Sequence, residues 1–91
     1  MKKAIATPEA PVPSSPLSQA IVQNGMVFVS GQGPVDPRTG LYAKSDIQAE
    51  TRRVLDNLTA VLAAAGTTRE KVVKVNVYLR DLGEFGAMNE I

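Results

Sequence analysis

The sequence predicts a single small α+β domain, and three observations carry that prediction. The dipeptide Asn24-Gly25 separates two short β-type runs, and Asn-Gly is the strongest hairpin signal because both residues tolerate positive φ. Apolar residues recur with helical spacing between positions 47 and 65. Residues 73–79 alternate apolar and polar, which is typical of a strand with one buried face. A chain of 91 residues forms one domain at most.

The N-terminal residues 1–16 are predicted to form an extended arm. Most of the prolines lie between positions 7 and 16, and proline favours extended backbone over helix. The hairpin follows, with strands at Ser18–Val22 and Met26–Ser30. The turn sequence Asp36-Pro37-Arg38-Thr39-Gly40 then leads to Leu41-Tyr42, which begins another strand or an edge segment.

A long helix is expected to begin at Ser45, where Gln48 three residues later completes a capping box, and to end at Gly66. Its apolar stripe is predicted to lie on a sheet. The stripe comprises Ile47, Val54, Leu55, Leu58, Val61, Leu62 and Ala65, and the polar face comprises Glu50, Arg53, Asp56, Asn57 and Thr59. One further turn is predicted at Glu70 to Val72.

The strand predicted at 73–79 directs Val73, Val75, Val77 and Leu79 toward this helix. Asp81 is then placed to cap a second helix, in which Phe85, Met88 and Ile91 recur at i, i+3 and i+6. No C-capping glycine or terminating proline follows this apolar stripe. We therefore expect residues 1–91 to be one C-terminally truncated domain, or a domain that completes its core with other chains.

Composition excludes several classes of chemistry. The chain has no cysteine and no histidine, so it lacks disulfides, Ser-His-Asp and Cys-His catalytic groups and the usual zinc ligands. A net charge of +1 with scattered basic pairs does not make the basic stripe of a nucleic-acid groove. No apolar run approaches the ~20 residues of a membrane helix, and no secretory signal is present, so a cytoplasmic protein is expected.

The glycine-rich segment after the second hairpin strand, Val27-Phe28-Val29-Ser30-Gly31-Gln32-Gly33-Pro34, is the candidate binding element. Its backbone N–H groups could cradle an anion, or the segment could be a bulge or turn with no ligand role. It is not a dinucleotide fingerprint, because the third glycine is missing. The carboxylates lie mainly at turns, caps and exposed faces, so none is assigned as a base. Asn57 and Asn76 are interpreted as structural amides with satisfied hydrogen bonds.

Seven segments in order resemble the RidA/YjgF family, also called the L-PSP endoribonuclease family. They are Ser15-Pro16-Leu17-Ser18-Gln19-Ala20, Val27-Phe28-Val29-Ser30-Gly31-Gln32, Asp36-Pro37-Arg38-Thr39-Gly40, Val54-Leu55-Asp56-Asn57-Leu58, Ala64-Ala65-Gly66, Val73-Lys74-Val75-Asn76-Val77-Tyr78-Leu79 and Ala87-Met88-Asn89-Glu90. The resemblance implies a chorismate-mutase-like α+β fold with a hairpin and a long helix packed on a mixed sheet. It also implies a homotrimer with ligand clefts between subunits. Family members hydrolyse reactive enamines and imines to 2-keto acids and ammonia without a cofactor.

The resemblance also supplies the candidate site. The arginine and glutamate that run the chemistry in the family lie in segments that this sequence does not contain, so no catalytic residue is assigned. The residues carried over as substrate-binding are Leu17, Ser30, Gly31, Gln32 and Asn89. Leu17 replaces a tyrosine over the cleft, and Gly33 stands where a branched aliphatic residue is usual, which would widen or loosen the same region.

These observations leave three candidate functions. The first is RidA-like deamination of 2-aminoacrylate-type intermediates, impaired or altered in this chain. The second is a non-catalytic module of the same fold that binds a small imine or 2-keto-acid-like ligand or serves assembly. The third, a ribonuclease, needs a basic groove and a base that the sequence does not provide.

Overall fold

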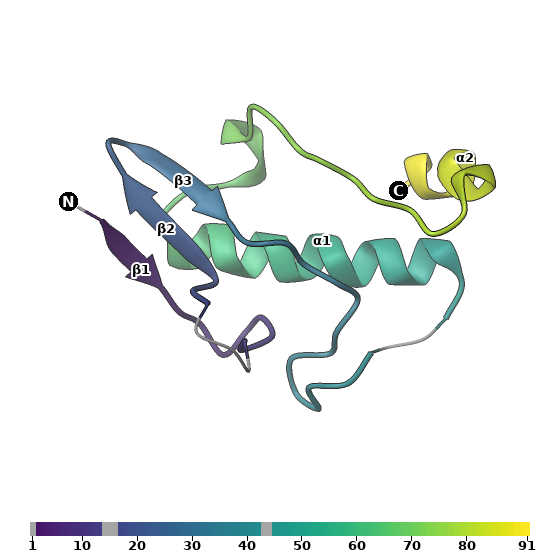
Figure 1. Ribbon diagram of the computed structural model, residues 1–91, viewed down its shortest axis with the longest axis horizontal. Helices are drawn as coiled ribbons and strands as arrows, with labels where there is room; N and C mark the ends of the chain where they lie inside the picture. The colour runs from purple at the N-terminus through teal and green to yellow at the C-terminus, as the bar shows by residue number, and fades with distance from the viewer. Residues whose placement is uncertain (1, 14–16, 43–44) are drawn as a thin grey trace.

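The computed structural model describes residues 2–13, 17–42 and 45–91. Three antiparallel strands form a sheet in the order β1-β2-β3, with β1 at Lys3–Ile5, β2 at Ala20–Gln23 and β3 at Met26–Val29. The helix α1, Ile47–Ala64, lies across one face of this sheet (Figure 1). Two 3-10 turns, η1 at Arg69–Lys71 and η2 at Leu82–Glu84, and the short helix α2, Phe85–Asn89, follow. The predicted α+β class is confirmed.

The hairpin forms as predicted. Asn24 and Gly25 have φ values of 53° and 74°, so both residues of the two-residue turn adopt the left-handed conformation that this turn type requires. The register pairs Ile21 with Phe28 and Val22 with Val27. The first strand, in which Ala4 pairs with Ile21, is an addition that sequence reasoning missed.

The pleat of the sheet sends alternate side chains to opposite faces. Ile5, Ala20, Ala10 and Val61 are buried together between sheet and helix. Val22, Val27, Val29, Ala60 and Ala65 pack around them. The opposite face carries the row Ala4, Ile21 and Phe28, and Phe28 is 60% exposed. The core is therefore one-sided: the sheet is covered on the helix face only, among the described residues.

The start of α1 differs from the predicted capping box. The N-cap is Asp46, whose Oδ1 accepts a hydrogen bond from the Ala49 backbone N–H at 2.8 Å. Ser45 instead donates its own N–H to Glu50 Oε2 at 3.3 Å. A carboxylate caps the backbone N–H groups and also interacts favourably with the positive end of the helix dipole, which explains why Asp46 replaces Ser45.

The end of α1 is as predicted. Gly66 has a φ of 85°, and its N–H donates to Ala63 O at 3.0 Å while Thr67 N–H donates to Leu62 O at 2.9 Å. These two bonds form a Schellman motif, in which glycine is favoured because a Cβ would be strained at this φ.

The predicted strand at 73–79 is wrong. These residues run as an unpaired connection from η1 to η2 (Figure 1), and no strand ladder includes them in the described chain. Val73 is 86% exposed and Val75 and Val77 are also exposed, so the alternating apolar face does not meet the helix. A period-2 pattern specifies a strand only where a neighbouring backbone supplies hydrogen bonds, and none of the described residues does so here.

The second helix is confirmed in outline. Asp81 Oδ1 accepts from Gly83 N–H at 2.9 Å and so caps η2, which leads directly into α2. Gln48 Nε2 ties this segment to α1 by donating to Ala87 O at 3.2 Å and to Glu90 Oε2 at 2.8 Å. The side chain of Phe85 remains exposed, so the apolar stripe of α2 is only partly covered.

The N-terminal arm is organised by the side chain of Gln19, which is 2% exposed. Gln19 Oε1 accepts from Thr7 N–H at 2.6 Å. Its Nε2 donates to the carbonyls of Thr7, Ala10 and Pro11 at 3.0, 3.2 and 2.9 Å. The arm is extended in β1, and a turn at residues 8–9 then reverses its direction. Residues 14–16 of the predicted arm lie outside the described residues.

Asn57 performs the same task for the loop after β3. Although it was predicted on the polar face of α1, it is fully buried. Its Nδ2 donates to Gly33 O at 3.2 Å and to Val35 O at 2.9 Å, and its Oδ1 accepts from Arg53 Nε at 3.2 Å. The interpretation as a structural amide holds for Asn57. Asn76 is exposed and makes no side-chain hydrogen bond to a described residue.

Replacing Gln19 tests whether its side-chain hydrogen bonds to the arm stabilise the fold. Gln19→Ala leaves the Thr7 N–H and the Ala10 carbonyl without their partners, so we expect the free energy of unfolding in urea to fall by about 1–3 kcal/mol. Gln32→Ala is the matched control, because Gln32 makes a single 3.4 Å bond to Ser30 O; its effect should stay within about 0.5 kcal/mol. Equal losses in the two variants would contradict a special role for Gln19.

Asn57→Ala tests whether the Asn57 hydrogen bonds to the loop after β3 stabilise the fold. The carbonyls of Gly33 and Val35 lose their buried donor, and we expect unfolding free energy to fall by about 1–3 kcal/mol. Asn76→Ala removes the same group from an exposed position and should have little effect. A chemical denaturation series on both variants gives the answer, and a neutral Asn57→Ala would refute the assignment.

Candidate functional site

The candidate site begins where β3 ends. Ser30 N–H donates to Gln19 O at 3.0 Å, and Ser30 Oγ donates to Ser18 O at 2.6 Å. The hydroxyl proton is thus committed to the protein, while the lone pairs of Oγ remain able to accept a hydrogen bond. Hydrogen bonds from both its backbone and its side chain therefore fix the position of Ser30 in the site.

Gly31 and Gln32 continue the chain from Ser30. Gly31 is exposed, and a Cβ built on it would meet nothing within 4 Å. Neither Gly31 nor Gln32 donates its backbone N–H to another described residue. Both N–H groups are therefore able to donate to a ligand such as a carboxylate.

Leu17 lies next to this strand end, and Asn89 does not. Leu17 is exposed and precedes Ser18, whose carbonyl accepts the Ser30 hydroxyl. The structure therefore gathers Leu17, Ser30, Gly31 and Gln32. Asn89 closes α2, which lies beside the first turns of α1, whereas β3 ends over the C-terminal half of that helix (Figure 1).

The loop that follows has a feature that sequence reasoning missed. A Cβ built on Gly33 would lie 3.3 Å from the Oη of Tyr42 and 3.5 Å from its Cε1. The ring of Tyr42 thus occupies the space beside Gly33, which the sequence had suggested would be widened or loosened. A glycine followed nine positions later by a tyrosine gave no sequence signal, because only the fold brings the two together.

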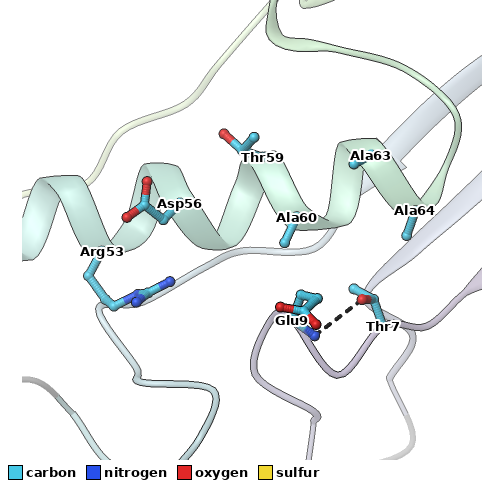
Figure 2. Close-up of a pocket in the computed structure, with 8 residues that line it drawn as sticks. All are labelled: Thr7, Glu9, Arg53, Asp56, Thr59, Ala60, Ala63 and Ala64. Atoms are coloured by element: carbon cyan, nitrogen blue, oxygen red, sulfur yellow. Dashed lines mark hydrogen bonds between the residues drawn. The ribbon is translucent and has the colours of Figure 1, made fainter.

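A separate groove of about 600 Å³ lies between the N-terminal arm and α1. Figure 2 shows Thr7 and Glu9 of the arm facing the alanines of α1, with the side chain of Arg53 nearby. Arg53 Nε is bound to Asn57 Oδ1, and Asp56 Oδ1 lies 3.8 Å from Arg69 Nη2. None of the predicted site residues lines this groove.

Two carboxyl groups have shifted pKa values. The backbone N–H of Arg38, 2.8 Å from Asp36 Oδ1, lowers the pKa of Asp36, and the Arg38 guanidinium lowers it further. The pKa of Glu70 is lowered mainly by a hydrogen bond from the Thr68 side chain. Both shifts favour the charged form and belong to a turn and to a 3-10 start, so neither marks a proton-donating acid.

Two further findings bear on the site. No group of three metal-ligating acidic side chains comes together in the part of the chain that the structure describes. Within the same residues, no helix combines the length and apolar character needed to cross a membrane.

Comparison with known proteins identifies the family. The family model described as Endoribonuclease L-PSP matches residues 7–91. A RutC family protein of Pyrococcus horikoshii is 48% identical over 91 residues, covering 100% of this chain and 72% of the relative. The 2-iminobutanoate/2-iminopropanoate deaminase of Salmonella typhimurium is 42% identical over 89 residues, covering 98% of this chain and 69% of that enzyme.

The solved structures agree with the sequence relatives. The crystal structure of Escherichia coli TdcF with bound serine superimposes with a TM-score of 0.91 at 39% identity, over 97% of this chain and 68% of that one. The RidA/YjgF resemblance and its fold are confirmed. The chain belongs to the Endoribonuclease L-PSP family, which includes the RutC and Rid proteins.

Proposed function

We propose that this chain is a subunit of a RidA-like hydrolase that converts small enamine or imine intermediates of the 2-aminoacrylate type to 2-keto acids and ammonia. The observation that carries the proposal is 42% identity with the Salmonella deaminase along 98% of the chain. The segment after β3 supports it, because the N–H groups of Gly31 and Gln32 donate to no other described residue and could donate to the carboxylate that such substrates carry. The serine bound by TdcF is likewise a small carboxylate.

The proposed reaction adds water to the imine carbon and releases ammonia, so the C=N bond becomes C=O. The N–H groups of Gly31 and Gln32 would hold the substrate carboxylate, and Ser30 Oγ would accept a hydrogen bond from the imine nitrogen or the water. The resemblance places the family's arginine and glutamate in segments absent from these 91 residues. We therefore assign no catalytic base.

A non-catalytic role in binding or assembly is the second candidate. The row Ala4, Ile21 and Phe28 leaves an apolar sheet face uncovered, and Phe28 is 60% exposed. Contiguous apolar surface of this kind is typical of an interface between subunits. We propose that copies of the chain associate through this face, with the homotrimer implied by the family as the expected assembly.

A ribonuclease role has less support. The family name mentions endoribonuclease, yet the net charge is +1 and Arg38 and Arg69 are paired with Asp36 and Asp56. Phosphate binding by RNA needs a concentration of positive charge along a groove. The described residues offer no such concentration near the strand end.

Ammonia release from freshly generated 2-aminoacrylate tests the enzymatic proposal. We expect the chain to accelerate release above the uncatalysed rate. Gly31→Val should lower that acceleration about tenfold or more, because the new side chain fills the space that the substrate needs. Gly31 has no positive φ and open surroundings, so the substitution should leave the fold intact.

Gly86→Val is the matched control, since Gly86 has equally open surroundings in α2. Ammonia release identical with and without the chain would refute the hydrolase. Titration of serine onto the same samples then decides whether the strand end binds a small carboxylate without catalysis.

Sedimentation equilibrium tests the assembly proposal. We expect the parent chain to be oligomeric and Phe28→Lys to weaken association about tenfold or more, because a buried interface position does not accept an unpaired charge. Leu41→Lys is the control, since Leu41 is also largely exposed, at 69%, but belongs to none of the three strands. A monomeric parent at all concentrations would contradict the interface.

A further inference from the structure

The loop after β3 folds back on itself, so that Tyr42 lies beside Val35 and Gly33 near its start. Val35 N–H donates to Gly33 O at 2.8 Å, and Asn57 Nδ2 holds the carbonyls of Gly33 and Val35 from the helix side. Asp36 N–H donates to Leu41 O at 2.9 Å. A β-bridge between Val35 and Tyr42 then closes the loop. These bonds fix the backbone of Tyr42 beside Gly33.

The contact between Gly33 and Tyr42 depends on the missing side chain. A Cβ at position 33 would lie 3.3 Å from the Oη of Tyr42, which is tighter than ordinary packing, and 3.5 and 3.6 Å from its Cε1 and Cζ atoms, which are ordinary contact distances. Alanine would therefore push the end of the ring outward by a few tenths of an ångström or turn it away. With glycine at position 33, the phenol lies against the backbone without this displacement.

The phenol is also available to a ligand. Tyr42 is 67% exposed, and its hydroxyl has no hydrogen-bond partner among the described residues. A phenol O–H donates well to a carboxylate or a ketone oxygen. Gly33 directly follows Gln32, so the ring lies beside the residue next to the Gly31 and Gln32 N–H groups, which donate to no other described residue.

We propose that Tyr42 is a specificity-determining residue of the strand-end site, with its hydroxyl donating to an oxygen of a small 2-keto acid or of the corresponding imine. This inference rests on the proposed function and deepens it. Gly33 acts as a positioning residue for Tyr42, because a side chain at position 33 would displace the end of the ring by a few tenths of an ångström.

Tyrosine fluorescence gives a direct readout, because the chain contains two tyrosines and no tryptophan. Tyr78 is 90% exposed and lies outside the site, so Tyr78→Phe leaves Tyr42 as the single emitter. Titration of this variant with 2-oxobutanoate and with pyruvate should change the Tyr42 emission saturably. The dissociation constant should match that of the unsubstituted chain, measured by calorimetry.

Two substitutions then separate the hydroxyl from the ring position. Tyr42→Phe keeps the ring against Gly33 and removes the donor, so we expect about three- to tenfold weaker binding of 2-oxobutanoate with unchanged unfolding by urea. Gly33→Ala keeps the hydroxyl but displaces the ring, and should weaken binding by a similar factor while shifting the Tyr42 emission before any ligand is added.

The outcomes are distinguishable. If the parent binds 2-oxobutanoate and both variants bind it equally well, Tyr42 is not a specificity residue, while the proposed function stands. If Gly33→Ala weakens binding and Tyr42→Phe does not, the hydroxyl contact is refuted. If the parent neither binds 2-oxobutanoate or pyruvate nor releases ammonia, the proposed function fails and the role of Tyr42 fails with it.

Discussion

The structure depends on the residue Gln19, because its side chain and its backbone serve different parts of the molecule. The side chain makes hydrogen bonds to four backbone groups of the N-terminal arm. The Gln19 carbonyl accepts the N–H of Ser30 and so fixes the end of β3. Burying an amide stabilises a fold only when nearly all of its hydrogen bonds are made, and here they are. Gln19 thus links the arm, through its side chain, to the candidate site, through its backbone carbonyl.

The elements predicted correctly from the sequence are those whose signals are local. Asn24-Gly25 specifies its own turn, and Gly66 specifies the end of α1, whatever the rest of the chain does. The strand at 73–79 failed because strand formation needs a second backbone, and alternation alone cannot supply one. The role of Gln19 was missed and Asn57 was placed on the polar face for the same reason, since the backbone groups that they bind lie 8 to 24 positions away.

The candidate site likewise combines residues that the sequence places together with residues that only the fold brings together. Ser30, Gly31 and Gln32 adjoin in sequence and follow a strand that the sequence identified, and Leu17 is brought beside them by the hairpin pairing. Asn89 lies on α2, which Gln48 ties to the start of α1 by a hydrogen bond to Ala87 O. The Gly33–Tyr42 contact arises from loop closure, which residue types alone do not reveal.

The sequence separations of the two buried amides also bear on the order of folding. Gln19 bridges 8 to 12 positions and the hairpin closes over two residues, whereas Asn57 must reach 22 to 24 positions back to Val35 and Gly33. Closing a short loop loses less chain entropy and is faster than closing a long one. We therefore expect the arm and hairpin to form a native-like nucleus first. Docking of α1, which secures the loop carrying Tyr42, then becomes the late step of folding.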